Sequence, residues 1–210
     1  MTGSLDKNLL TIGHSNLPLD QFMTMLKAHN VTAIVDVRSV PFSRRFPWFS
    51  SRTLSERLQS KGIAYVMMGE TLGGRPANPA LYCDGVADYE AMASTTDFHA
   101  SIDRVIAESA RHRPCLMCSE REPLDCHRCL LVSRALAERG CSIGHILGDG
   151  SLEPHPATEE RLLAGLRPGD DLFGDRESRL ADAYRKRARR SAARLSDRVR
   201  PGRTPRVFSS

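Results

Sequence analysis

VTAIVDVR, residues 31–38, is a nearly continuous run of β-branched and apolar side chains. A strand with one solvated face would alternate apolar and polar residues, so this run predicts a strand covered on both faces, as in a parallel sheet. LLTIGH, residues 9–14, precedes it and also reads as a buried strand. Between the two, residues 18–29 carry apolar side chains at helical spacing. The beginning of the chain therefore predicts strand, helix, strand.

The same alternation continues to residue 150. Further strands are expected at residues 63–68, 115–118 and 142–147, and further helices at residues 50–60, 98–111 and 126–139. Strands that alternate with helices pair in parallel through right-handed crossovers, so the pattern predicts a three-layer α/β sandwich with a mainly parallel sheet of about five strands. Residues 70–89 are rich in glycine and proline and predict a long loop, which inside a compact domain is usually functional or disordered.

Residues 1–150 are thus expected to form one α/β domain. Residues 151–175 should hold a short helix at 158–166 and a linker that includes Pro168–Asp171, and residues 176–210 a basic helix at about 178–195 followed by a disordered tail. From Arg176 onward the chain has 12 Lys and Arg against 3 Asp and Glu, whereas the rest has 18 against 22. The net positive charge therefore belongs to the C-terminal extension, which is either a solvated basic helix or a surface for nucleic acid or an acidic partner.

The composition is that of a soluble globular protein, with 40% apolar and 26% charged residues. No stretch approaches the roughly 20 apolar residues of a membrane span, and the first residues show no secretory signal. We therefore expect no membrane partner and a cytoplasmic location. The six cysteines are then expected to be reduced thiols, some buried and some reactive or metal-bound, rather than disulfides.

Polar and titratable side chains gather where the predicted strands end. They are His14, Ser15 and Asn16 after the first strand, Asp36 and Arg38 in the second, Cys118 and Glu120 after the fourth, and Cys126, His127 and Arg128 at the start of the next helix. In parallel sheets the carboxyl ends of the strands share one edge, where ligands bind. This clustering predicts a functional site rather than a scatter of solvated charge.

The residue types suggest roles at this edge. A helix N-terminus and cationic neighbours lower the pKa of a thiol, so Cys126 is a candidate nucleophile, and so is Cys118. Glu120, His14 and His127 are candidate proton carriers.

Arg38 and Arg128 are candidates for gripping a phosphate or carboxylate, together with Asp36, Ser15 and Asn16 as substrate contacts. Gly73, Gly74 and Arg75 could bring backbone N–H groups to the same anion. The plainer alternative pairs Arg38 with Asp36 or Glu120 and buries Cys118 as a small apolar residue.

Four cysteines have the spacing of a metal site, as Cys115-x-x-Cys118 and Cys126-x-x-Cys129. Residues three apart in an extended strand point to opposite faces, so Cys115 and Cys118 would not converge. This argues against a four-thiol zinc site.

A mixed site is the other metal alternative, in which Cys118 and Cys126 bind zinc or iron together with His14 or His127. Cys118 and Cys126 could also cycle between dithiol and disulfide.

The loop at residues 39–49 mixes arginines with aromatic residues, among them Phe46, Trp48 and Phe49, as single-stranded nucleic-acid sites do. We favour a loop that covers the domain. His99, His112 and His155 are expected at the surface.

Four segments resemble the bacterial "domain of unknown function 488" family. They are Thr11-Ile-Gly-His-Ser-Asn16, Asp36-Val-Arg-Ser-Val-Pro41, Leu72-Gly-Gly-Arg75 and Cys118-Ser-Glu-Arg-Glu-Pro-Leu-Asp-Cys-His-Arg128, and they occur in the family's order across residues 9–150. The resemblance implies an α/β fold and a shared pocket built from these motifs, without an established reaction. It singles out Cys118, Glu120, Cys126, His127 and Arg128, and leaves Cys115 and Cys129 outside the family's pattern.

These observations predict an enzyme that acts on an anionic, phosphate- or nucleotide-like substrate, as a cysteine-dependent or metal-assisted hydrolase or transferase. The alternatives are a non-catalytic metal-binding or thiol-redox module and a nucleic-acid-binding protein that uses the basic extension.

Overall fold

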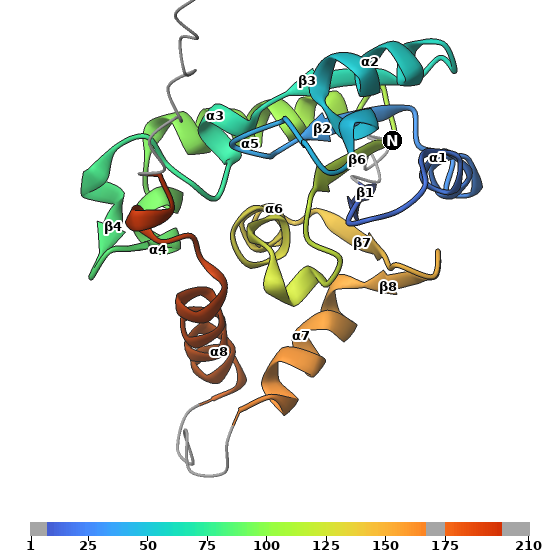
Figure 1. Ribbon diagram of the computed structural model, residues 1–210. Coiled ribbons are helices and arrows are strands. Elements are labelled where there is room, and N and C mark those ends of the chain that lie inside the picture. The colour runs from blue at the N-terminus through green and yellow to red at the C-terminus, as the bar shows by residue number, and fades with distance from the viewer. Residues whose placement is uncertain (1–7, 167–174, 199–210) are drawn as a thin grey trace, which may run out of the picture.

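The computed structural model describes residues 8–166 and 175–198 (Figure 1). Its core is a six-stranded sheet in the order β3-β2-β6-β1-β7-β8, in which all neighbours are parallel except β7 and β8. The strands are β1 (Asn8–Gly13), β2 (Ala33–Asp36), β3 (Ala64–Met67), β6 (Pro114–Cys118), β7 (Ser142–Ile146) and β8 (Leu152–Pro154). The expected linker at Pro168–Asp171 and the tail at 201–210 lie outside the described residues.

The five predicted strands are all present, and they form the parallel part of the sheet. Every residue of β2 and β6 is buried, and so is β1 from Leu9 onward, as their apolar runs require. The sixth strand, β8, was not predicted, because Leu152–Pro154 is short and half-exposed and carries no apolar pattern.

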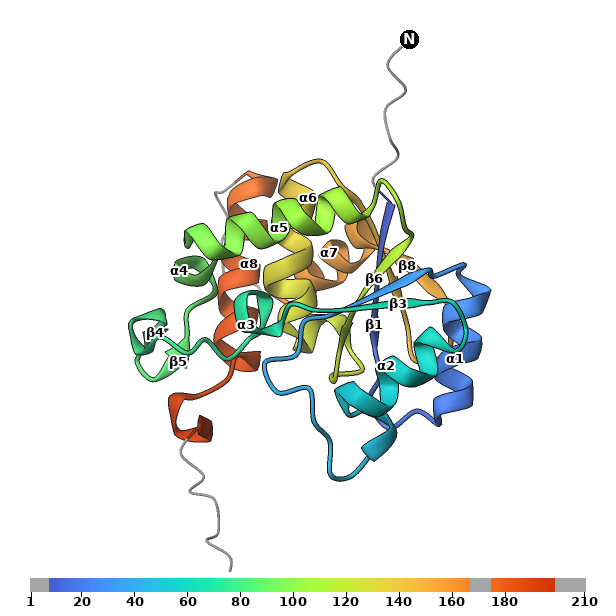
Figure 2. The ribbon, with the colours of Figure 1, turned by 90° about the horizontal axis from the view of Figure 1, so that it is seen from above.

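Helices cover both faces of the sheet, which confirms the α/β fold and the three layers (Figure 2). One face packs against α1 (Leu19–Ala28) and α2 (Ser51–Gln59) through a core that contains Phe22 and Leu54. The other face packs against α5 (Thr96–Glu108) and the helix that ends as α6 (Arg134–Glu138).

Alternation along β6 decides which cysteines can meet. Cys115 and Met117 lie in the core under α1 and α2, whereas Leu116 and Cys118 lie in the core on the other face. The expectation that Cys115 and Cys118 point to opposite faces is therefore confirmed.

The prediction of one long loop at residues 70–89 is wrong. The segment contains α3 (Gly69–Leu72), the hairpin of β4 (Tyr82–Cys83) and β5 (Val86–Ala87), and the start of α4 (Tyr89–Ala93). Asp84 and Gly85 form the two-residue turn of this hairpin, both with positive φ, at 50° and 73°. Asp-Gly is a known signal for such a turn, and it was present in the sequence.

The helix expected at residues 126–139 begins with an irregular segment. Arg128–Ser133 is a π-helix (η4), and α6 continues from Arg134. The Ser133 hydroxyl donates to the Arg128 carbonyl across 2.7 Å, five residues back, which suits the wider turn. Single π turns inside helices are frequent at functional sites. Four short 3-10 turns complete the connections: η1 (Pro47–Phe49), η2 (Pro79–Leu81), η3 (Pro123–Asp125) and η5 (Leu195–Arg198).

The C-terminal extension packs on the rest of the molecule. It contains α8 (Arg176–Ser191) and is preceded by α7 (His155–Ala164), and Tyr184 of α8 is only 3% exposed. After α8, Ala193 and Leu195 form backbone hydrogen bonds with Ala87 and Gly85 of the β4–β5 hairpin.

Arginines of α8 form ion pairs with acidic residues that come earlier in the sequence, for example Arg187 with Asp125 and Arg189 with Asp84. Within the parts of the chain that the structure describes, no helix has the length and apolar character needed to cross a membrane.

Candidate functional site

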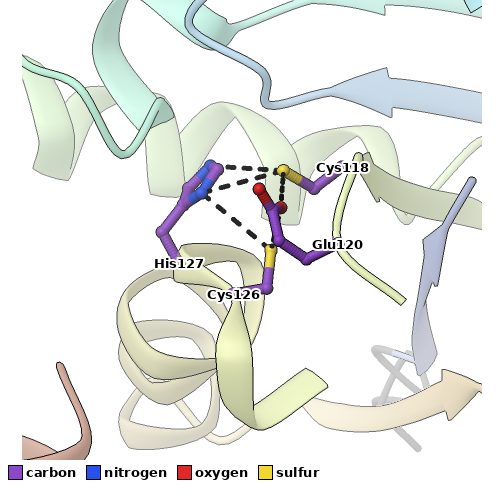
Figure 3. Close-up of side chains that lie close together, drawn as sticks. All are labelled: Cys118, Glu120, Cys126 and His127. Carbon is purple, nitrogen blue, oxygen red and sulfur yellow. Dashed lines mark hydrogen bonds between the residues drawn. The ribbon is translucent and has the colours of Figure 1, made fainter. Parts of the chain in front are cut away.

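Four side chains converge just beyond the carboxyl end of β6 (Figure 3). Glu120 Oε2 lies 2.9 Å from Cys118 Sγ and 3.0 Å from Cys126 Sγ. The Nδ1 atom of His127 lies 3.7 Å from Cys118 Sγ and 4.0 Å from Cys126 Sγ. We call these four residues the thiol cluster. The structure brings these four sequence-predicted residues together at this edge of the sheet.

Backbone contacts with the first strand place Cys118. β1 pairs its Gly13 with Cys118 of β6. The contact continues beyond the end of β1, where the His14 N–H donates to the Cys118 carbonyl across 2.9 Å. A Cβ atom on Gly13 would lie 1.8 Å from the Glu120 carbonyl oxygen. Gly13 is therefore required for the loop that carries Glu120 to cross over the end of β1.

Cys126 caps the following helix. Its carbonyl accepts the N–H groups of Cys129 and Leu130, each at 3.0 Å, and its sulfur accepts the N–H of Arg128 at 3.4 Å. Burial opposes ionisation of this thiol, but a hydrogen bond from Cys118 and the charges of Arg128 and His127 outweigh it. These contacts hold the pKa of Cys126 well below its usual value.

His127 is fixed by a contact on its far side. The Val37 carbonyl oxygen, which can only accept, lies 2.8 Å from Nε2, so Nε2 carries a hydrogen and Nδ1 faces the two sulfurs. Gly74 packs so closely on the ring that a Cβ there would lie 2.8 Å from it. Burial lowers the pKa of His127, but Cys126 and Glu120 outweigh burial and raise it.

The two other acidic groups of the cluster hold their protons more tightly than usual. Burial, followed by the neighbouring Cys126, raises the pKa of Cys118 well above its normal value, and the same two causes raise the pKa of Glu120. Three acidic groups at such short distances repel one another when all are ionised. The cluster therefore retains a proton or holds another cation.

Arg128, expected to grip a substrate anion, is fully buried instead. Its guanidinium donates to the carbonyls of Glu120 and Arg121 at 2.5 and 3.0 Å, and its Nε has no partner among the described residues. Arg128 therefore holds the loop that carries Glu120 and places positive charge beneath Cys126.

Arg38 follows the plainer alternative and pairs with Asp36. Its Nε and one terminal nitrogen donate to the Asp36 carboxylate at 2.9 and 2.5 Å, and Tyr65 donates to the same carboxylate at 2.6 Å. Asp36 is 1% exposed, so the structure gives it a partner in the protein rather than a place on a pocket wall.

His14 is held between this ion pair and the loop at residues 39–49. Its Nδ1 bonds the Ser15 carbonyl, its Nε2 lies 3.2 Å from an Arg38 nitrogen, and its ring stacks on Phe49 with 4.2 Å between centroids. Burial, then the Arg38 charge, lowers the pKa of His14 to about 4. His14 is thus neutral at pH 7 with both nitrogens engaged, and it lies outside the thiol cluster.

An open pocket of about 430 Å³, which we call the thiol pocket, lies over the cluster. Cys118, Glu120 and His127 form part of its lining, and the remainder is contributed by Arg38, Ser39, Val40, Phe42, Gly74, Arg75, Tyr89, Ser119, Asp125 and Ser191–Ala193.

Arg75 is the exposed cation of this lining, and its guanidinium has no hydrogen bond or ion pair among the described residues. The Arg75 N–H donates to the Ser39 hydroxyl at 3.0 Å, and a Cβ on Gly73 would lie 2.3 Å from that hydroxyl. The two glycines of this motif thus serve close packing, on Ser39 and on His127.

The remaining predicted residues line a second, more open hollow next to the first. It is lined by His14, Ser15, Asn16, Ser43, Arg45 and Phe46 and shares Arg38, Phe42 and Ser119 with the thiol pocket. The sequence-predicted site is therefore divided between two adjoining hollows.

Two groups of side chains within residues 8–166 and 175–198 have donor atoms close enough for a metal ion. One is the thiol cluster, and the other is Cys129 with His145 and His155. Because Cys115 belongs to neither group and Cys129 to the second, the four-thiol arrangement is not assembled.

The second group belongs to a buried chain of hydrogen bonds. Thr11 bonds His145 at 2.8 Å, and His145 and His155 bond each other at 2.9 Å. His155 also bonds the Tyr184 hydroxyl of α8 at 3.1 Å. The expectation that His155 is a surface residue is wrong, because it is 3% exposed and joins the extension to the sheet.

Sequence reasoning missed three contributors to the site. The Val37 carbonyl orients His127, Tyr89 closes one side of the thiol pocket, and Ser191–Ala193 line it from the C-terminal extension. Every residue has a backbone carbonyl, so the amino-acid type of Val37 does not reveal this role. Ser191–Ala193 lie outside the family motifs, and only a structure could bring them to the pocket.

A family model described as "domain of unknown function DUF488" matches residues 18–135 of the chain. No curated protein and no solved structure matches it.

Proposed function

The chain belongs to the family described as domain of unknown function DUF488, and within it we propose an enzyme that acts on an anionic, phosphate- or nucleotide-like substrate in the thiol pocket. One observation carries this proposal. Reactive groups lie in the lining of an open polar pocket that also presents the exposed cation of Arg75. A purely structural cluster would need neither the opening nor the free guanidinium.

The pocket suits a small phosphate-bearing molecule. Its volume of about 430 Å³ lies within the usual range for small-molecule sites. A planar guanidinium such as that of Arg75 can form paired hydrogen bonds with a phosphate or carboxylate. Arg38 also lines the pocket but is largely engaged by Asp36, so Arg75 replaces Arg38 and Arg128 as the principal anion-binding residue.

The reaction class that we propose is hydrolysis or group transfer. Glu120 is the exposed member of the thiol cluster, and its raised pKa suits a group that takes up and releases a proton. Cys118 lines the pocket, whereas Cys126 lies behind it. We therefore assign Glu120 as the proton carrier and Cys118 as the sulfur nearest to a bound substrate.

Two alternatives receive less support. A non-catalytic metal or redox module would use the same cluster but leaves the pocket and Arg75 without a purpose. Nucleic-acid binding through the extension would need free positive charge, whereas Arg187 and Arg189 of α8 are paired with Asp125 and Asp84.

The test is a panel of phosphate-bearing compounds, from inorganic phosphate to nucleoside triphosphates, scored by the thermal midpoint of unfolding. A ligand at about 100 times its Kd adds about 2.7 kcal/mol, which a 30-fold loss of affinity reduces to about a third. We expect at least one compound to stabilise the wild type and Arg75→Ala to lose most of the shift. Arg52→Ala, an exposed arginine of α2, is the matched control and should keep it.

Turnover of the stabilising compound is then measured with Glu120→Gln. Binding should persist while turnover falls by about 100-fold or more, the contribution of a general acid or base. If no compound stabilises the wild type, or if Arg75→Ala responds as the wild type does, the proposal is wrong.

A further inference from the structure

The geometry points to a binding site for zinc or a chemically similar divalent metal ion. Its ligands are Cys118 Sγ, Cys126 Sγ and His127 Nδ1, and Glu120 lies beside a coordination position that stays open. This inference deepens the proposed function and rests on it for any role in turnover. Occupancy of the site can be measured without a substrate.

The donor set selects the metal class. Two thiolates and one imidazole are soft and borderline ligands, which favour zinc and disfavour magnesium and calcium. Zinc sites that keep a position open for water use three protein ligands, and two cysteines with one histidine are a known set.

The distances between donor atoms fit a tetrahedral ion. Zn–S bonds of about 2.3 Å and Zn–N bonds of about 2.0–2.1 Å place sulfur and nitrogen about 3.6 Å apart at tetrahedral angles. The His127 Nδ1 atom lies 3.7 and 4.0 Å from the two sulfurs. Only small side-chain movements would bring these three donors to bonding distance of one ion.

His127 also has the support that metal-binding histidines usually show. A ligating histidine almost always donates its other ring N–H to a carbonyl or carboxylate, which fixes the ring and the free nitrogen. Here Nε2 donates to Val37 at 2.8 Å, and Gly74 closes the space above the ring. The remaining nitrogen, Nδ1, is the nearer one to Cys118 Sγ, at 3.7 Å against 4.0 Å for Nε2, and it lies 4.0 Å from Cys126 Sγ.

Glu120 differs from the three ligands in its exposure and its place. Its Oε2 lies 2.9 and 3.0 Å from the sulfurs, closer than two ligands of one zinc ion would be, so the carboxylate stands where a cation would bind. Glu120 is exposed and lies in a loop, whereas Cys118 ends a strand and Cys126 begins a helix. It can turn aside on metal binding and remain next to the open coordination position.

The experiment uses the full chain and needs no substrate. Protein is stripped of metal, reconstituted with zinc or cobalt(II), dialysed and analysed for bound metal. We expect about one ion per chain in the wild type and a thiolate-to-cobalt charge-transfer absorption that added zinc abolishes. Cys118→Ser, Cys126→Ser and His127→Ala should bind metal at least about 10-fold more weakly.

Cys115→Ser is the matched control, because this buried cysteine lies on the same strand as Cys118 but on the opposite face. It should keep the metal, and so should Glu120→Gln. Circular dichroism identifies any variant that fails to fold, and the cobalt absorption of the wild type stands without variants.

Absence of stoichiometric metal or of the cobalt absorption in the wild type would overturn the inference. So would a folded Cys118→Ser variant with unchanged affinity. These failures differ from failure of the proposed function: bound metal without any stabilising phosphate compound contradicts the proposed function alone, and the reverse result contradicts the metal site alone.

Discussion

His145 of β7 and His155 of α7 share a hydrogen bond of 2.9 Å between their rings, and neither lines the thiol pocket. The pair joins the central sheet to the C-terminal extension, since Thr11 bonds one ring and Tyr184 the other. Both rings are buried, and only one hydrogen can occupy the contact between them. The pair therefore requires at least one neutral imidazole.

Acid should weaken the fold through these histidines. Burial lowers the pKa of His155 to about 4 and the pKa of His145 well below its usual value, whereas both are near 6.5 in the unfolded chain. Between about pH 6.5 and 4 the unfolded state binds more protons, so stability is complete above this window and falls as the pH decreases through it. We expect a loss of up to about 1.4 kcal/mol per pH unit per histidine, measured by urea unfolding.

His155→Gln should flatten this pH dependence, while His112→Gln, outside the buried chain, should leave its slope unchanged. Equal slopes in wild type and His155→Gln would show that the acid response arises elsewhere.

Tyr184→Phe should loosen the extension. The hydroxyl bonds His155 and also Glu159 at 3.1 Å, and its loss leaves a buried ring nitrogen without that partner. We expect the free energy of unfolding to fall by about 1–3 kcal/mol. Tyr82→Phe, whose hydroxyl bonds the Pro76 carbonyl at a half-buried position, should cost less. An unchanged Tyr184→Phe variant would mean that α8 is held by its apolar contacts and ion pairs alone.

Gly74→Ala should damage the site more than the fold. A Cβ at this position would lie 2.8 Å from the His127 ring and must displace it, at a typical cost of about 1–3 kcal/mol. We expect weaker cobalt binding and lower turnover. Gly165→Ala is the control, because its nearest contact would be an ordinary 3.4 Å and its φ is negative. Unchanged cobalt affinity in Gly74→Ala would show that His127 does not need this support.

The sequence predicted the sheet, and the edge at which the candidate side chains gather, for a physical reason. Strands buried on both faces need unbroken apolar runs, and parallel strands bring their carboxyl ends to one edge, so residues 31–38 and the motif at 118–128 were informative by themselves. The β4–β5 hairpin was missed although Asp84-Gly85 is a typical hairpin-turn sequence, because the surrounding glycines and prolines favoured a loop. β8 offers no such signal.

The hydrogen-bond and ion-pair partners of individual side chains were harder to predict than the places of those side chains in the fold. Nothing in the residue types shows that Arg38 pairs with Asp36, that Arg128 turns toward backbone carbonyls, or that Arg75 stays free. His155 begins a helix of polar sequence and looked like a surface residue; its burial depends on α8, which packs against it from far along the chain.

The position of β1 has a consequence for how this protein can be divided. β1 lies between β6 and β7 in the sheet, yet the family match begins at residue 18 and ends at residue 135, leaving both β1 and β7 outside. A fragment trimmed to the match would lose a fully paired central strand and expose the edge of β6. We expect such a fragment to be insoluble or unfolded by circular dichroism, and residues 8–198 to fold. The stretch that the family model matches is therefore expected to be smaller than the smallest piece of the chain that folds by itself.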